Sequence, residues 1–185
     1  MKTFFAAAFA VTALSTSFAS AQTMNPDVGG APMLTTLNIV ENAVNSADHT
    51  TLVAAVVAAG LVETLQSPGP FTVLAPTNAA FAALPAGTVE SLLLPENLAQ
   101  LQTILTCHVI AGNALSGDIV GMIEADGGSH VVNTVGGCAF TLGRDAMGGV
   151  TITDGQGRVA TVTIADVVQS NGVIHVIDSV LLPAM

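Results

Sequence analysis

The chain has 185 residues, of which 51% are hydrophobic and 9% are charged, and its formal net charge at pH 7 is -10. Three basic residues stand against thirteen acidic ones, so no positively charged surface can form, and binding to nucleic acid or to anionic lipid headgroups is disfavoured. Trp and Tyr are absent, which removes the usual stacking groups for sugars and bases.

The first 21 residues predict a secretory signal peptide. Lys2 supplies a minimal positive start, residues 4–14 are apolar, and Ala19-Ser20-Ala21 is an A-x-A cleavage site. We expect cleavage between Ala21 and Gln22 and export of the product to a periplasm or to the extracellular space, without a membrane span. Because Lys2 is the sole lysine, its loss excludes Schiff-base chemistry from the mature chain.

Residues 22–36 are rich in Pro, Gly and polar residues and show no periodicity. They predict a flexible leader, in which Met33 and Leu34 are the candidates for contact with the rest of the chain. Residues 37–185 have the length of a single domain that can bury its own core without a metal.

Two segments near the start of this domain have helical periodicity. Apolar residues recur on one face over 37–46 and again over 50–59. Gly60 is placed to terminate the second of these helices.

The stretch GPFTVLAPTNAAF, residues 69–81, predicts a strand, a stop and a helix in immediate succession. Residues 71–74 are apolar or β-branched throughout, which favours a buried strand, and Pro76 is expected to end it. Thr77 is a suitable N-cap residue, and the alanine-rich segment after it favours a helix.

Two further helices are predicted before the pattern becomes β. The first covers 88–93, and the second begins at Pro95, continues to Leu105 and leads into an extended segment over 107–110. After Ile119 the candidate strands are 130–133, 138–142, 150–154, 159–165 and 173–177.

Turn residues separate several of these strands. Asp154-Gly155-Gln156-Gly157 predicts a hairpin turn, and Asn171-Gly172 predicts a turn before the last strand. Because helices come first and strands later, without βαβ alternation, the sequence indicates an α+β domain.

Three segments resemble the signature regions of the fasciclin (FAS1) family: FTVLAPTNAAF, the histidine-bearing segment that ends at His108, and NGVIHVIDSVLLP. The resemblance extends over residues 38–183 and implies the FAS1 fold, a β-sandwich-like bundle of about seven strands with several helices packed along one edge. The matching positions are Phe71, Thr72, Val73, Ala75, Pro76, Thr77, Asn78, Phe81, His108, Asn171, Gly172, His175, Val176 and Asp178.

Both histidines in these segments are predicted to be structural. His175 lies in a strand that is apolar on both faces, which favours a core histidine bonded to backbone. At His108 the family typically has a Tyr–His pair, which is implicated in integrin binding in animal relatives. Here Cys107 replaces the tyrosine, which argues against integrin recognition.

Motifs for catalysis or cofactor binding fail on their context. Gly155-x-Gly157-x-x-Ala160 matches a loose dinucleotide fingerprint but precedes a strand, where the fingerprint requires a helix. The four histidines have no metal-ligand spacing, and Glu124 and Asp126 are expected in a solvated loop. We therefore predict no catalytic, cofactor-binding or metal-binding residue.

Cys107 and Cys138 are the two cysteines of the chain. An even count in an exported protein favours a single disulfide, and the alternative is two buried free thiols.

The family resemblance implies a secreted, non-enzymatic protein for cell-surface adhesion or for interaction with an extracytoplasmic protein or matrix component. We expect a monomer or a weak homo-oligomer. The alternative is a binding or carrier module for a small apolar ligand or a polysaccharide, which a large apolar pocket would favour over a dense core. An enzyme is the third and least supported class, because each motif tested fails on context.

Overall fold

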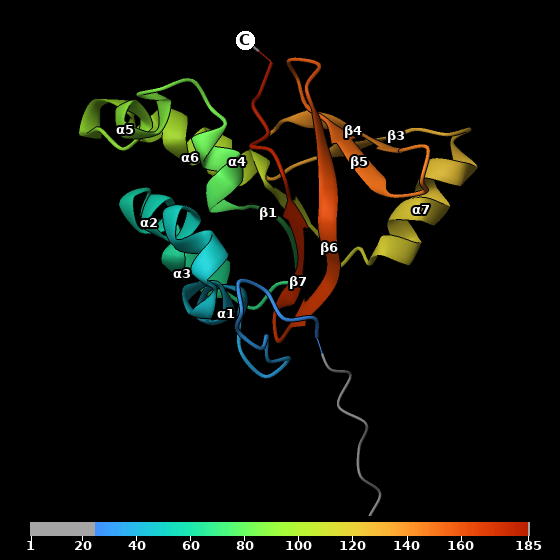
Figure 1. Ribbon diagram of the computed structural model, residues 1–185, viewed down its shortest axis with the longest axis horizontal. Coiled ribbons are helices and arrows are strands. Elements are labelled where there is room, and N and C mark those ends of the chain that lie inside the picture. Colours follow the sequence, from blue (N-terminus) through green and yellow to red (C-terminus); the bar gives the residue numbers. More distant parts are fainter. Residues whose placement is uncertain (1–24, 185) are drawn as a thin grey trace, which may run out of the picture.

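Residues 25–184 are described by the computed structural model, and seven strands among them form one continuous sheet (Figure 1). The predicted signal peptide and its Ala21–Gln22 cleavage site lie outside these residues. Neighbouring strands are antiparallel, except that β1 and β7 are parallel. In spatial order the strands are β2 (Val109–Ala111), β1 (Phe71–Pro76), β7 (Gly172–Ile177), β6 (Val159–Gln169), β5 (Val150–Thr153), β4 (Ala139–Arg144) and β3 (His130–Asn133).

Most helices gather beside β1 and β7, and one lies on the opposite side of the molecule beside β3–β5 (Figure 1). This arrangement confirms the predicted α+β class with helices along one edge (Figure 1), to which α7 adds a second helical flank. The helices are α1 (Ile39–Asn45), α2 (Thr50–Ala58), α3 (Val62–Gln66), α4 (Asn78–Ala82), α5 (Thr88–Leu92), α6 (Leu98–Cys107) and α7 (Ser116–Ala125), with 3-10 turns at Ala47–His49 and Pro95–Asn97.

The apolar core has two parts. One part lies between the helices α1–α6 and the strands β1 and β7, and it includes Val56, Leu105 and Ile174. The other lies between α7 and the strands β4–β6, and it includes Ile123 and Phe140. Because burial of apolar surface is the main favourable term in folding, each half of the molecule has its own source of stability.

Local signals in the sequence act as predicted. Thr77 Oγ1 accepts a hydrogen bond from the Ala80 N–H at 3.3 Å and caps α4. Gly60 follows α2 with φ +68°, the left-handed conformation that favours glycine after a helix. The Asp154 carboxylate accepts the backbone N–H groups of Gln156 and Arg158, both at 2.9 Å, which closes the β5–β6 hairpin.

Two helices, α3 and α7, are missing from the sequence prediction. Glu124 and Asp126, expected in a loop, instead lie in the last turn and at the C-cap of α7. The α7 sequence contains Gly117 and Gly121 together with β-branched residues, so its intrinsic helix propensity is low. It forms because its Ile119 and Ile123 side chains are buried against the sheet, and such packing supplies most helical stability in proteins.

The segment 25–36 differs from the flexible leader that its composition predicts. Val28 and Met33 are buried, whereas Leu34 is 49% exposed. The Asn25 side chain donates to the Val168 carbonyl at 2.6 Å and accepts the Val168 N–H at 2.9 Å. Apolar residues this sparse give no periodicity in the sequence, yet they suffice to hold the segment against the domain.

Candidate functional site

The two signature strands lie side by side in the middle of the sheet. β1 and β7 pair in parallel from Phe71 opposite Gly172 to Pro76 opposite Ile177. A Cβ atom at Gly172 would overlap the carbonyl oxygen of Phe71, so the pairing requires glycine there. The prediction that Pro76 ends the extended pairing is wrong by one residue, because Pro76 still pairs and the Thr77 N–H then donates to the Ile177 carbonyl at 3.3 Å.

Two asparagines of the signature segments bind the helices to this strand pair. Asn171 accepts the Ile39 N–H at 3.1 Å, at the start of α1, and donates to the Leu65 carbonyl at 2.8 Å, in α3. Asn78 Oδ1 accepts the Thr51 N–H at 3.0 Å, in the first turn of α2, and Asn78 Nδ2 donates to the Ala47 carbonyl at 2.9 Å. These asparagines therefore position helices rather than face a ligand.

We expect Asn78→Ala to lower the free energy of unfolding by about 1–2 kcal/mol, because α2 loses the side-chain acceptor at its N-terminus and the Ala47 carbonyl loses a donor. The measurement is urea unfolding followed by circular dichroism. Asn113→Ala, at an exposed loop position, is the control and should change stability by less than about 0.5 kcal/mol. Equal effects of the two substitutions would contradict this role for Asn78.

His108 lies at the C-cap of α6, not in the extended segment that the sequence predicts. The helix continues through Cys107, and β2 begins at Val109. His108 Nδ1–H donates to the Ile104 carbonyl at 2.8 Å, and Nε2 accepts the Leu181 N–H at 3.0 Å. Both ring nitrogens thus bond to backbone in the neutral form, and burial lowers the pKa of His108 to about 4, opposed by the Ile104 carbonyl and the charge of Asp154.

His175 is also engaged by backbone, as the sequence predicts. Its Nε2–H donates to the Ala114 carbonyl at 2.8 Å, and its Nδ1 accepts the Asp166 N–H at 3.3 Å. Burial lowers the pKa of His175, opposed by the Ala114 carbonyl and the charge of Asp166. The imidazole is fully buried and therefore joins the loop before α7 to the strands β6 and β7.

Asp166 is a structural residue that the sequence prediction missed. It has φ +59° within β6, where the register with β7 shifts, and its carboxylate accepts the backbone N–H of Ser116 at 2.7 Å. The same carboxylate accepts the Ser116 hydroxyl, so it caps the N-terminus of α7 from a distant part of the chain. The sequence offers one signal for this role, because Asp166 is a charged residue within an otherwise apolar stretch of the strand.

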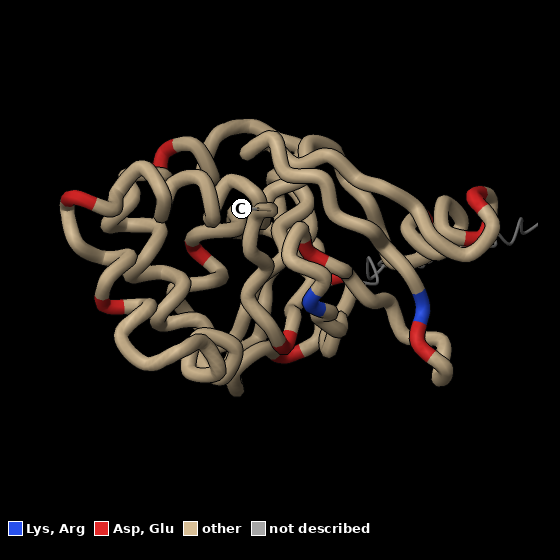
Figure 2. Tube along the Cα trace, turned by 90° about the horizontal axis from the view of Figure 1, so that it is seen from above, with Lys and Arg blue, Asp and Glu red and all other residues tan. Residues whose placement is uncertain are grey.

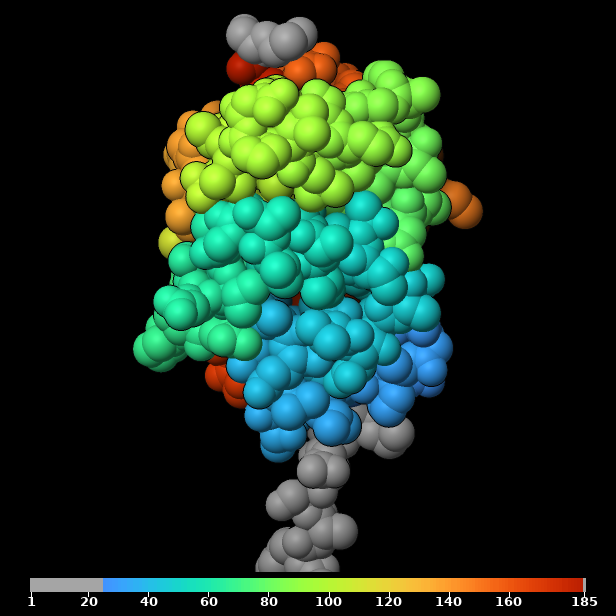
Figure 3. Space-filling view, turned by 90° about the vertical axis from the view of Figure 1, so that its left-hand side faces the viewer, coloured from blue at the N-terminus to red at the C-terminus, as the bar shows by residue number. Residues whose placement is uncertain are grey.

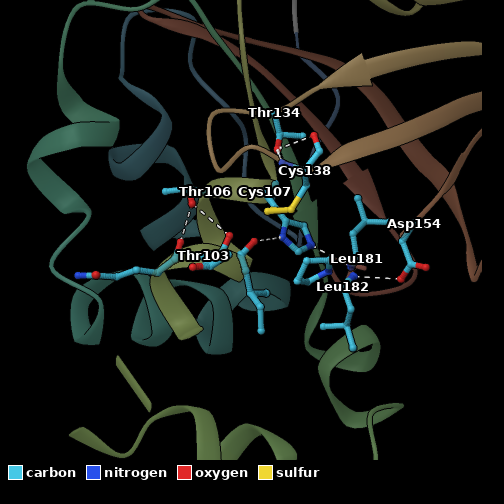
Figure 4. Close-up of a disulfide and its surroundings, with 12 residues drawn as sticks. Thr103, Thr106, Cys107, Thr134, Cys138, Asp154, Leu181 and Leu182 are labelled. Carbon is cyan, nitrogen blue, oxygen red and sulfur yellow. Dashed lines mark hydrogen bonds between the residues drawn. A yellow bond between two sulfur atoms is a disulfide. The ribbon is translucent and has the colours of Figure 1, made fainter. Parts of the chain in front are cut away.

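The structure joins Cys107 and Cys138 in a disulfide, with their Cα atoms 5.4 Å apart (Figure 4). It links the C-terminal end of α6 to the loop between β3 and β4. The Thr134 hydroxyl accepts the Cys138 N–H at 3.1 Å, and Figure 4 shows Thr134 next to Cys138 on the strand side of the disulfide. The bond therefore ties the helical half of the molecule to its β half.

Asp154 lies on the other side of the region shown in Figure 4, where its carboxylate accepts the Leu182 N–H at 3.0 Å. It also forms an ion pair with Arg158 at 2.8 Å. Burial raises the pKa of this carboxyl, but hydrogen bonds from Leu182, Arg158 and Gln156 outweigh that effect and lower it. The nearby signature residue Asp178 accepts the Thr161 N–H at 2.8 Å. These acids fasten the C-terminal segment to the sheet.

The remaining polar candidates are at the surface. Arg144 pairs with Glu124 at 2.8 Å, and His130 pairs with Asp126 at 2.7 Å. Acidic positions are dispersed over the chain, and the helical half in Figure 2 contains acidic positions without basic ones. Across residues 25–184, no group of three or more His, Cys, Asp or Glu side chains is arranged to hold a metal ion.

An apolar cavity of about 240 Å³ lies between the helices α1–α3 and the strands β1 and β7. Residues from each of these elements, together with the segment before α1, line it; examples are Met33, Val40, Val56, Leu65, Val73 and Ile174. His49 also lines it and is 3% exposed, and its Nε2 atom has no hydrogen-bond partner within the described part of the chain. Sequence patterns did not single out this histidine.

A second hollow, of about 530 Å³, lies between α7 and the strands β3–β5. Its polar residues Asn113, Asp118 and Asn133 are exposed, His130 is half-buried, and the hollow is open to solvent. Among the described residues, each buried side-chain polar atom of this second hollow has a hydrogen-bond partner. The second hollow therefore has no counterpart of the unpaired His49 Nε2 in the first cavity.

Comparisons with known proteins point to one family. A model of the Fasciclin domain matches residues 47–183. The chain is 51% identical over 151 residues to Protein sll1483 of Synechocystis sp., which covers 80% of this chain and 75% of that protein. It is 36% identical over 144 residues to Immunogenic protein MPB70 of Mycobacterium bovis, covering 75% of this chain and 65% of that protein.

A solved structure with the same fold is a FAS1 domain pair from the insect cell adhesion molecule Fasciclin I, with a TM-score of 0.72 and 17% sequence identity. The match covers 85% of this chain and 57% of that one. In the present structure, none of the helices within residues 25–184 is both long enough and apolar enough to cross a membrane.

Proposed function

The chain belongs to the fasciclin domain family, and from this membership we propose that it is an exported, non-enzymatic protein that mediates cell-surface adhesion or binds a protein or matrix component. The solved structure with the same fold comes from a cell adhesion molecule. The protein acts through its folded surface, as a monomer or a weak homo-oligomer.

The observation that supports this proposal most is the use of the signature histidines. Both ring nitrogens of His108 and of His175 bond to backbone groups, and burial keeps both rings neutral. Neither imidazole has a nitrogen left to accept a proton from a substrate or to bind a metal. The signature segments therefore build a scaffold, and recognition falls to the residues that the scaffold exposes.

The proposal includes export to a periplasm or beyond, which rests on Lys2, the apolar residues 4–14 and the Ala19-Ser20-Ala21 site. We expect the full chain, expressed in its own organism, to be recovered outside the cytoplasm with Gln22 as its first residue. Fractionation followed by N-terminal mass spectrometry measures this. Recovery of a chain that begins at Met1 in the cytoplasmic fraction would contradict export.

The interaction itself is tested by capture. Residues 22–185 with a C-terminal affinity tag are incubated with the envelope and secreted fractions of the source organism, and retained material is identified by mass spectrometry. Amine-reactive crosslinkers are unsuitable, because no lysine follows Lys2. Retention of a reproducible partner at low and at physiological salt supports the proposal; a blank at both salts, with folded bait, opposes it.

The apolar cavity favours a second candidate, a carrier for a small apolar ligand. A cavity of about 240 Å³ exceeds what close packing normally leaves inside a domain, where voids larger than a water molecule are few. The alternative ligand class from the sequence analysis, a polysaccharide, gains no support from an apolar lining. Native mass spectrometry of the protein purified from its own organism tests this candidate, and a co-purified molecule is the expected result.

A further inference from the structure

We propose that the cavity between α1–α3 and the strands β1 and β7 binds a small, uncharged apolar molecule with one oxygen acceptor, and that His49 Nε2–H donates a hydrogen bond to that oxygen. The proposal rests on the carrier function and specifies the chemistry of its ligand.

The volume sets the size of the ligand. A dry engineered cavity of about 150 Å³ is known to accommodate benzene, so a cavity of about 240 Å³ accommodates in proportion a group of about ten non-hydrogen atoms. The lining is mostly apolar, from Val, Leu, Ile, Ala and Met side chains with Phe71. The polar residues that line it are Ser46, His49, Thr64, Thr106 and His108. A compact apolar body therefore fills it favourably, whereas ordered water lacks the two to four polar partners that it needs.

His49 supplies the polar contact, because its Nε2 has no partner among the described residues, whereas lining residues such as Thr106 and His108 bond to backbone carbonyls. It is buried at the N-cap of α2, and its Nδ1 lies 2.9 Å from Ser46 Oγ. If the Ser46 hydroxyl donates to Nδ1, the proton is on Nε2. The ring lies near the Ala75 backbone, but no hydrogen bond of normal geometry joins that backbone to Nε2, so a single donor is left without an acceptor. If Nδ1 donates instead, both the hydroxyl hydrogen and Nε2 are left unsatisfied. The first arrangement leaves fewer unsatisfied buried groups, so Nε2–H is the donor.

The charges around the cavity favour an uncharged ligand. Burial lowers the pKa of His49, opposed by the backbone of Ala75 and the charge of Asp48, so the ring is neutral at pH 7 and offers no charge to a carboxylate. The charged residues near α1–α3 are acidic, namely Glu41, Asp48 and Glu63. The helical half in Figure 2 has no basic position to offset them. A carbonyl, ether or hydroxyl oxygen therefore fits better than a carboxylate.

Entry is possible between the helices. Val44 on α1 and Val57 on α2 both line the cavity and are each 60% exposed, so the opening has an apolar rim. Figure 3 shows the helical face, where the seam between the atoms of α1 and those of α2 and α3 is narrow but open. Val28 and Met33, from the segment before α1, complete the wall on the N-terminal side.

The experiment compares acetophenone with α-methylstyrene, a hydrocarbon of the same shape in which a methylene group replaces the carbonyl oxygen. Each probe is titrated into residues 22–185 and into His49→Leu, with methyl NMR shifts as the readout. We expect His49→Leu to lower the affinity for acetophenone about tenfold, which is the equivalent of one buried hydrogen bond. The affinity for the hydrocarbon should change by less than about threefold. His130→Leu, at a half-buried histidine that lines the second hollow and not this cavity, is the control and should leave the affinity of the first cavity for both probes unchanged.

The nitrogen-15 shift of His49 gives a second readout in the unaltered protein, which keeps the test valid if His49→Leu does not fold. We expect the Nε2 resonance to move with acetophenone and to stay in place with the hydrocarbon. If both probes bind and His49→Leu weakens them equally, the role of His49 is overturned while the carrier function stands. If neither probe binds saturably, the carrier function and the inference both fail.

Discussion

Replacing His108 with phenylalanine is expected to lower the free energy of unfolding at pH 7 by about 3 kcal/mol. The substitution leaves the Ile104 carbonyl and the Leu181 N–H buried without their partner, and each such loss costs about 1–3 kcal/mol. Phenylalanine is somewhat larger than histidine, so the substitution leaves no cavity, and the loss reports the two hydrogen bonds together with some overpacking. Urea unfolding at pH 7 measures it.

The same residue should make the protein acid-sensitive. The pKa of His108 is about 4 in the folded chain and about 6.5 in the unfolded chain. Between pH 4 and pH 6.5, this residue therefore binds a proton in the unfolded chain but not in the folded chain. Its stabilising contribution is complete above pH 6.5 and declines as the pH falls towards 4. A difference of about 2.5 pKa units corresponds to about 3 kcal/mol. The lowered pKa values of His175 and His49 act in the same direction.

The free energy of unfolding, measured at pH 7, 6, 5 and 4.5, separates the contribution of His108 from those of the other titrating groups. We expect His108→Phe to have a shallower pH dependence than the unaltered protein, so that the gap between the two narrows as the pH falls. Asn113→Ala, at an exposed position that does not titrate, should keep the full pH dependence. Parallel curves for the unaltered protein and His108→Phe would show that His108 does not titrate in this window.

The second large effect is expected at the disulfide. The double substitution Cys107→Ala and Cys138→Ala removes a link that closes a loop of 31 residues, which the chain-entropy model values at about 3–4 kcal/mol. For a domain of this size the loss corresponds to a fall in Tm of about 10 °C. Thermal unfolding followed by circular dichroism, without reductant, measures it.

Reductant provides the matched control. The unaltered protein in reductant should unfold within a few degrees of the double variant, and the double variant should not respond to reductant. A single substitution is less informative, because it leaves one buried thiol free to form intermolecular disulfides. Equal Tm values for the two proteins without reductant would mean that the Cys107–Cys138 bond contributes no stability.

Much of the fold follows from local patterns. The hairpin at 154–157, the cap at Thr77 and the termination of α2 at Gly60 each depend on neighbours within a few residues, so a single sequence is enough to predict them. His175 was predicted to bond to backbone because it interrupts a strand that is apolar on both faces. Cysteine parity and the expected compartment similarly favoured the disulfide.

The features that were missed depend on distant parts of the chain. β1 pairs in parallel with β7, about a hundred residues away, and no local pattern encodes that partner. α7 forms because the sheet buries its isoleucines, and Asp166 caps it from fifty residues away. His49 belongs to a segment without a strong motif. Its Nε2 is buried without a hydrogen-bond partner only in the fold, where α1–α3 and the two strands surround it, so the sequence alone does not indicate its role.

If the folded surface of this domain attaches to other molecules, cells of the source organism should adhere to a surface coated with it. Surfaces are coated with folded residues 22–185 or with the same protein after reduction and alkylation in denaturant, and cells of the source organism are allowed to settle. The two coatings have the same composition and differ in fold. We expect clearly more cells to be retained on the folded coating after washing. Equal retention on both coatings would contradict this expectation.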